Sequence, residues 1–118
     1  MSTQALLLYV EPNPVLRRLG AAILRDVYTV VPVASIDDTD SRCEPEVIVL
    51  DLSNVAGAKG IWGVLTRRWP AVPVVVVTTA AAERDIDMLR ALGPVTVVVK
   101  PFVPDALRQA IAEAVSIR

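Results

Sequence analysis

Apolar residues gather along this chain into five short runs, separated by polar residues, prolines and glycines. The runs cover residues 5–10, 28–34, 46–51, 72–78 and 95–99. The third run is rich in Val and Ile and too short for a typical helix, which predicts a strand buried on both faces, as in parallel sheets. It ends at Asp51. A carboxylate at the end of a buried strand is costly unless another group pairs with it or uses it.

Helical patterns follow four of the five runs. Asn13 before Pro14 is typical of an N-cap and a first helical position. The expected helices cover residues 14–26, a stretch that ends at residue 69, residues 81–92, and residues from 104 onward. The apolar residues that share a face in these helices are Leu16, Leu19 and Ile23, then Ile61, Leu65 and Trp69, then Ile86 and Leu89, then Leu107, Ile111, Ala114 and Val115.

The segment from Ser35 to Pro45 breaks this alternation. It holds few apolar residues and many Asp, Ser and Thr side chains, which bond to their own backbone and favour turns over helices. We therefore expect a loop or a single helical turn here, at most two turns long. The sheet face next to it should be partly uncovered and available as a contact surface.

The alternation of strands and helices predicts one α/β domain over residues 1–118, a three-layer sandwich on a parallel five-stranded sheet. Right-handed crossovers and a switch point beside the first strand favour the flavodoxin-like order 2-1-3-4-5, with the second helix shortened. Pro32 removes a ladder donor from the second strand and so favours an edge position for it.

Composition narrows the classes of protein. The apolar fraction of 53% is high, yet no apolar run approaches the roughly 18 residues that a spanning helix needs. The net charge of -1, without a basic stripe, argues against direct nucleic-acid binding. Cys43 stands alone, so an internal disulfide is excluded and a reducing cytoplasm fits. The chain has no histidine, so any phosphohistidine donor must be another protein.

Four polar side chains come at the carboxyl ends of the predicted strands: Glu11, Asp51, Thr78 and Lys100. In a parallel sheet of the expected order they converge on one rim, where open α/β folds place their ligands. A carboxylate there can attack a phosphoryl group, a divalent cation can neutralise the gathering charge, and lysine and threonine can hold the transferred oxygens. This set predicts an aspartyl-phosphate switch.

Over its whole length the chain resembles the receiver domains of response regulators. The pieces that carry the resemblance are the acidic loop and proline-led helix around Glu11 and Pro14, then Val-Leu-Asp51-Leu, Pro-Val-Val-Val-Val-Thr78 and Lys100-Pro-Phe. The resemblance implies a signalling module of a two-component (phosphorelay) system rather than an enzyme. Its partners would be a histidine kinase or phosphotransfer protein and a downstream protein or fused output domain, and a homodimer is compatible with it.

The same resemblance implies roles for individual residues. Asp51 corresponds to the phosphoacceptor, Thr78 to the switch hydroxyl and Lys100 to the phosphate-binding lysine. The Mg²⁺ ligands would be Asp51, Glu11 and the backbone carbonyl of Ser53.

The chain departs from the receiver pattern at three positions. Pro12 stands where a second acid would contact the metal directly, Val55 replaces a usual proline, and Val97 replaces a usual aromatic residue. These departures indicate an atypical receiver with a degraded acid pocket. We therefore expect weak or absent Mg²⁺ binding and a switch that is weakened or independent of phosphorylation.

Other interpretations stay open at this point. The chain is also compatible with an ordinary Mg²⁺-dependent switch, or with an ion pair between Asp51 and Lys100 that only stabilises the rim. Glu11 is equally compatible with a solvated loop acid. A phosphohydrolase with Asp51 as nucleophile would need a second acid at the position of Ser53. A nucleotide or flavin binder would need a glycine-rich loop after the first strand, where this chain has Glu11-Pro12-Asn13-Pro14.

Overall fold

A computed structural model of the chain describes residues 4–52, 57–79 and 83–116. Its five strands form one parallel sheet in the order β2-β1-β3-β4-β5, which confirms the predicted topology. The strands are β1 (Leu6–Val10), β2 (Thr29–Val33), β3 (Val47–Leu52), β4 (Val74–Thr78) and β5 (Val95–Val99).

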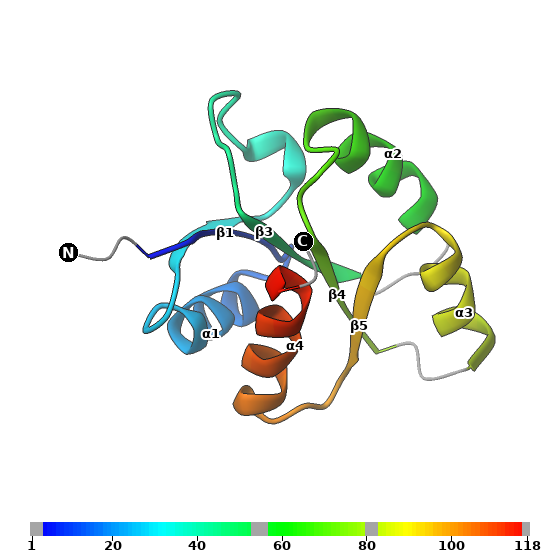
Figure 1. The fold of residues 1–118 in the computed structure, drawn as a ribbon. Coiled ribbons are helices and arrows are strands. Elements are labelled where there is room, and N and C mark those ends of the chain that lie inside the picture. The colour runs from blue at the N-terminus through cyan, green and yellow to red at the C-terminus, as the bar shows by residue number, and fades with distance from the viewer. Residues whose placement is uncertain (1–3, 53–56, 80–82, 117–118) are drawn as a thin grey trace.

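Helices cover both faces of the sheet and make the three layers (Figure 1). One face carries α1 and α4, and the other carries α2, α3 and the short 3-10 turn η1. The bounds are α1 (Pro14–Leu24), η1 (Ile36–Asp38), α2 (Ala58–Arg68), α3 (Glu83–Ala91) and α4 (Pro104–Ser116). None of the helices in the described part of the chain has the length and apolar character that a membrane crossing requires.

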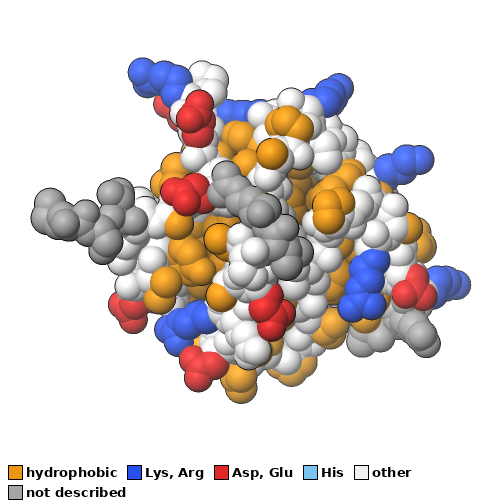
Figure 2. All heavy atoms as spheres, viewed as in Figure 1, with side chains coloured by type: hydrophobic (Ala, Val, Ile, Leu, Met, Phe, Trp, Pro, Cys, Tyr) orange, Lys and Arg blue, Asp and Glu red, His pale blue; other side chains and the backbone are white. Residues whose placement is uncertain are grey.

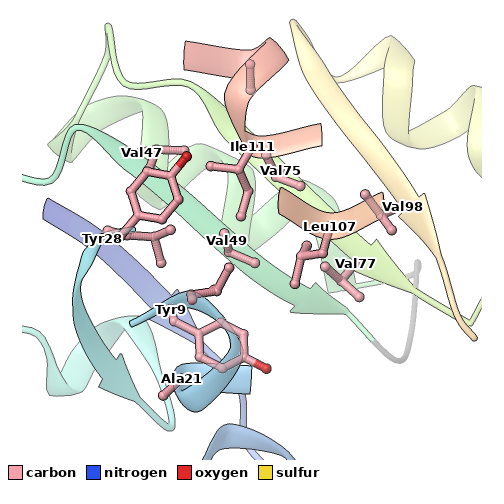
Figure 3. Close-up of a cluster of buried hydrophobic side chains, with 13 residues drawn as sticks. Tyr9, Ala21, Tyr28, Val47, Val49, Val75, Val77, Val98, Leu107 and Ile111 are labelled. Atoms are coloured by element: carbon pink, nitrogen blue, oxygen red, sulfur yellow. The ribbon is translucent and has the colours of Figure 1, made fainter. Parts of the chain in front are cut away.

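The core on the α1 and α4 side is built from alternate strand residues and two tyrosines. Figure 3 shows Tyr9 and Tyr28 beside Val49, with Leu107 and Ile111 of α4 packed over the sheet. Both tyrosines are buried. Successive strand residues point to opposite faces, so the neighbours of these residues build the other core.

The core on the opposite side contains Leu65 of α2, Trp69 directly after the end of α2, and Leu89 of α3, all buried. Ile61 is half-buried and packs against them. The shared face of α2 predicted from steps of four residues is therefore confirmed.

Helix α1 packs on the sheet through a face that differs in part from the predicted one: Ile23 packs against the core as predicted, and Leu24 is fully buried. Gly20 and Ala21 are buried, whereas Leu16 and Leu19 are 43% and 57% exposed. The cause is Tyr9, because a Cβ added at Gly20 would lie 2.2 Å from its hydroxyl oxygen. The small residues let the helix approach this ring closely, and Leu16 and Leu19 then point outward.

The segment from Ser35 to Pro45 forms only η1 and a loop, as predicted. The Ser35 side chain caps η1 by accepting the Asp37 N–H. The rest of the loop is held by the end of α2: Arg68 donates to the carbonyls of Thr39 and Asp40, at 3.2 and 2.6 Å, and the Trp69 indole donates to that of Cys43 at 3.0 Å.

Strand β2 lies at the edge of the sheet, as Pro32 predicts, and is only half-buried. On the face of the molecule that Figure 2 shows, basic and acidic side chains are interspersed, with hydrophobic side chains between them. That face therefore carries no single block of positive charge that would attract a polyanion.

Candidate functional site

Three strand ends bring an acid, a second acid and a lysine into contact at the carboxyl edge of the sheet. The Lys100 ammonium forms an ion pair with Asp51 and lies 3.7 Å from Oε1 of Glu11. The two carboxylate side chains are 7% and 4% exposed, while that of Lys100 is 25% exposed. The cation therefore enters from the solvent side and neutralises part of a buried acidic pair.

Thr78 lies beside this group, fully buried at the end of β4. Its Cα pairs in register with Leu52, the neighbour of Asp51, on one side and with Val99, the neighbour of Lys100, on the other. The backbone N–H of Lys100 donates to the Thr78 carbonyl at 2.8 Å. The parallel register thus brings together the four strand-end residues that the sequence singled out.

Glu11 is part of the buried rim and not a solvated loop acid, with 3% of the residue exposed. The backbone of its loop is anchored at both ends, because Glu11 N–H donates to Val33 at 2.9 Å and Asn13 N–H donates to Glu11 Oε2 at 3.1 Å. Asn13 also caps α1 by accepting two backbone N–H groups. The turn that the capping sequence predicts therefore sets the position of this acid.

The electrostatic setting of Glu11 favours its neutral form. Burial raises the pKa of this carboxyl, the Asp51 carboxylate raises it further, and the Asn13 N–H and the Lys100 ammonium act in the opposite direction. Its Oε1 atom is buried and accepts no hydrogen bond in the described part of the structure. Glu11 thus holds its proton more tightly than a solvated glutamate does, because its pKa is raised.

Two carboxylates at this rim, those of Glu11 and Asp51, are the side chains that could hold Mg²⁺, an ion that is commonly bound by one or two carboxylates together with phosphate and water. Pro12 is exposed and offers no side-chain oxygen where a third acid would stand. Within residues 4–52, 57–79 and 83–116, three acidic, cysteine or histidine side chains nowhere cluster closely enough to hold an ion. The predicted metal-facing carbonyl of Ser53, and Val55, lie outside the described residues. Asp37, Asp38 and Asp40 are exposed on and after η1.

Two residues at this edge were not found by sequence reasoning. Arg17 donates to the backbone carbonyls of Glu11 at 2.9 Å and Pro12 at 3.3 Å, and so holds the acidic loop against α1. Tyr9 lies beneath the acids, and burial raises the pKa of its hydroxyl, with further contributions from the charges of Glu11 and Asp51. The sequence around these two residues does not indicate a role at the site, because an arginine on a helix and a tyrosine in a strand are both common.

Comparison of the sequence with models of protein families and with curated proteins found no match. Solved structures, in contrast, match the fold along nearly the whole chain. A response regulator from Thermotoga maritima superposes with a TM-score of 0.83 at 15% identity, over 97% of this chain and 99% of that one.

Two further matches are more similar in sequence. The receiver domain of a sensor histidine kinase from Pseudomonas aeruginosa, which has a magnesium ion coordinated in its active site cleft, gives a TM-score of 0.75 at 23% identity and covers 97% of this chain and 99% of its own. The chemotaxis protein CheY4 of Vibrio cholerae gives 0.73 at 21% identity, over 95% and 99%. This chain has the fold of response-regulator receiver domains.

Proposed function

We propose that this protein is a receiver-like signalling module that acts through protein–protein contacts rather than through turnover of a substrate. Asp51 is its phosphoacceptor position, Lys100 its phosphate-binding cation and Thr78 its switch hydroxyl. The observation that carries the proposal is the contact of one ammonium with two buried carboxylates, next to a proline that supplies no acid.

The chemistry available to such a site is transfer of a phosphoryl group to Asp51. A carboxylate oxygen would attack phosphorus while the bond from phosphorus to the donor breaks, a P–N bond to imidazole nitrogen in phosphohistidine or a P–O bond in acetyl phosphate, and Lys100 would pair with the transferred oxygens. The Glu11 and Asp51 carboxylates are the side chains that would hold Mg²⁺, with the Ser53 carbonyl as a third ligand. In the present arrangement Lys100 already neutralises part of their charge, so we propose weak Mg²⁺ binding.

A weak metal site implies slow phosphorylation. A Lewis-acid metal contributes on the order of several kcal/mol to stabilisation of the developing charge. Each ~1.4 kcal/mol lost slows the reaction about tenfold. The module is therefore a weakened switch, or one whose contacts do not depend on phosphate.

The partners follow from the same proposal. A histidine kinase or phosphotransfer protein would supply the phosphoryl group, since the chain has no histidine of its own. A downstream protein or a fused output domain would receive the signal in the cytoplasm.

Acetyl phosphate labelling followed by mass spectrometry tests the proposal. The unmodified protein with Mg²⁺ should show slow or undetectable labelling at Asp51, and Asp51→Asn should show none. Pro12→Asp should bind Mg²⁺ more tightly and label faster by about tenfold or more, because it adds a direct carboxylate ligand.

Rapid, stoichiometric and Mg²⁺-dependent labelling of the unmodified protein would overturn the weakened switch. An ordinary phospho-aspartate switch would then be the function. The convergence of Asp51, Thr78 and Lys100 at one rim is the observation that favours this second candidate.

A further inference from the structure

An apolar pocket of about 380 Å³ lies beside the acidic rim, between η1 and α2. Its walls are Val10 and Leu50 from the ends of two strands, Ile36 from η1, and Ile61 and Val64 from α2. Both elements that flank it lie on the same side of the sheet (Figure 1). Its volume falls within the range of pockets that bind small molecules.

The pocket exists because one crossover lacks a full helix. The other three crossovers carry helices of 11, 11 and 9 residues, whereas the connection from β2 to β3 carries a three-residue turn. Ile36 is the buried residue of that turn, and it covers only part of the sheet face. The loop beyond it is held at the far end of α2 by Arg68 and Trp69, which keeps it from folding over the gap.

The charges around the pocket determine whether it favours a cationic, neutral or anionic ligand. Its lining is mostly apolar and includes two carboxylates, those of Asp37 and Asp51, but none of the residues that line it is basic. Lys100 pairs with Asp51 and supplies one positive charge, whereas Asp37 and Asp51 together carry two negative charges, so this part of the pocket stays net negative even when Glu11 is neutral. A neutral or anionic ligand would leave this negative charge without a partner, whereas a cation would offset it.

We propose that this pocket binds a small amphiphilic amine, with its apolar body against Ile36, Ile61 and Val64 and its ammonium at Asp51 and Asp37. Binding does not require phosphorylation, so the site goes beyond the function proposed above. If Asp51 is the phosphoacceptor, an ammonium on its carboxylate also competes with phosphoryl transfer. The module would then respond to a small molecule as well as to a kinase.

Binding of 4-phenylbutylamine to the ¹⁵N-labelled protein tests the pocket, with 4-phenylbutanol and 4-phenylbutyrate as neutral and anionic counterparts. We expect saturable NMR shifts at the amides of Ile36, Ile61 and Val64. The amine should bind at least about tenfold more tightly than the alcohol, a difference of about 1.4 kcal/mol. Asp37→Asn should reduce this preference.

The chain offers one variant that should block the pocket and a matched control in the same helix. Gly60 lines the pocket and Gly63 does not, both belong to α2, and a Cβ at either position meets no atom within 4 Å. Gly60→Leu should weaken amine binding at least tenfold, and Gly63→Leu should leave it within about twofold, since only the first narrows the pocket. Val64→Phe, which fills the pocket from the same helix, is the second blocking variant if Gly60→Leu does not fold.

Equal binding of the alcohol and the amine would overturn the proposal. Shifts that do not saturate, or an equal loss of binding in Gly60→Leu and Gly63→Leu, would also overturn it. These outcomes are independent of the labelling experiment, because no phosphoryl donor or Mg²⁺ is present.

Discussion

At the scale of single residues, the contact between Tyr9 and Gly20 decides how α1 meets the sheet. A Cβ at Gly20 would lie 2.2–2.6 Å from three atoms of the tyrosine ring and hydroxyl, and the ring is buried. Gly20→Ala should therefore destabilise the protein by about 1–3 kcal/mol, the usual cost of overpacking. Urea unfolding of both proteins measures this difference in the free energy of unfolding.

The control for this substitution is Gly63→Ala in α2, where a Cβ meets open space. It should stabilise the protein by about 0.5–1 kcal/mol, because alanine loses less backbone entropy in a helix. Tyr9→Phe should recover part of the loss in Gly20→Ala, since it removes the closest atom. An unaffected Gly20→Ala protein would contradict the close packing of α1.

A second residue-scale prediction concerns the buried acid Glu11, whose pKa is raised chiefly by burial. The folded protein binds this proton more tightly than the unfolded chain does. Its contribution to stability is therefore present at low pH and is lost as pH rises through the raised pKa. Glu11→Gln should raise the free energy of unfolding at pH 7 by about 1 kcal/mol, with a smaller difference at lower pH.

The exposed Glu44→Gln is the matched control and should change little at either pH. Unfolding curves at several pH values between about 4 and 8 give the comparison. A Glu11→Gln protein that is less stable than the unmodified one at pH 7 would mean that attraction to Lys100 outweighs burial.

At the scale of elements, the end of α2 holds the loop that replaces a helix. Arg68 donates two hydrogen bonds to loop carbonyls, and its guanidinium carbon lies 4.4 Å from the centroid of the Trp69 ring. Arg68→Ala should cost about 1–2 kcal/mol, the order of hydrogen bonds to a charged group. It should also speed amide hydrogen exchange over residues 39–43.

Arg67→Ala is the control, because Arg67 is the exposed neighbour on the same helix. Its exchange rates over residues 39–43 should match those of the unmodified protein. Equal acceleration in both variants would show that the loop responds to the charge of the helix end rather than to the bonds of Arg68.

For the molecule as a whole, we predict that Val97 limits how a change at the rim reaches α3. It pairs in register with Val76 and packs into the core beneath α2 and α3. The resemblance to receiver domains implies an aromatic ring at this position, with its rotation coupled to the hydroxyl at the Thr78 position. Valine has a restricted χ1 angle and no aromatic ring whose rotation could transmit the change.

We therefore expect beryllofluoride with Mg²⁺ to shift few NMR signals of α3, β5 and α4, even in Pro12→Asp, where binding of the mimic should be stronger. Shifts should stay near Asp51, and Asp51→Asn should show none of them. Shifts concentrated on α3, β5 and α4 would contradict this prediction.

Local sequence patterns were enough to predict the sheet, its strand order and the residues at its rim. These features depend on local patterns: runs of branched residues, a capping turn at Asn13 and polar residues at strand ends such as Asp51. The absence of a helix after β2 was also predictable, because the segment around Asp38 lacks an apolar face. Local patterns suffice here because parallel strands of known order have their carboxyl ends at one edge.

Which surfaces of the elements pack together could not be predicted from local patterns and is known from the three-dimensional structure. The exposure of Leu16 and Leu19 in α1 follows from a ring on β1. The buried state of Glu11 follows from its neighbours on other strands, and the pocket beside Asp51 follows from a loop held by Arg68. Each depends on residues far apart in sequence, and hydrophobic periodicity carries no information about such contacts. The physical reason is that packing and desolvation depend on the three-dimensional surroundings of a side chain, not on its neighbours along the chain.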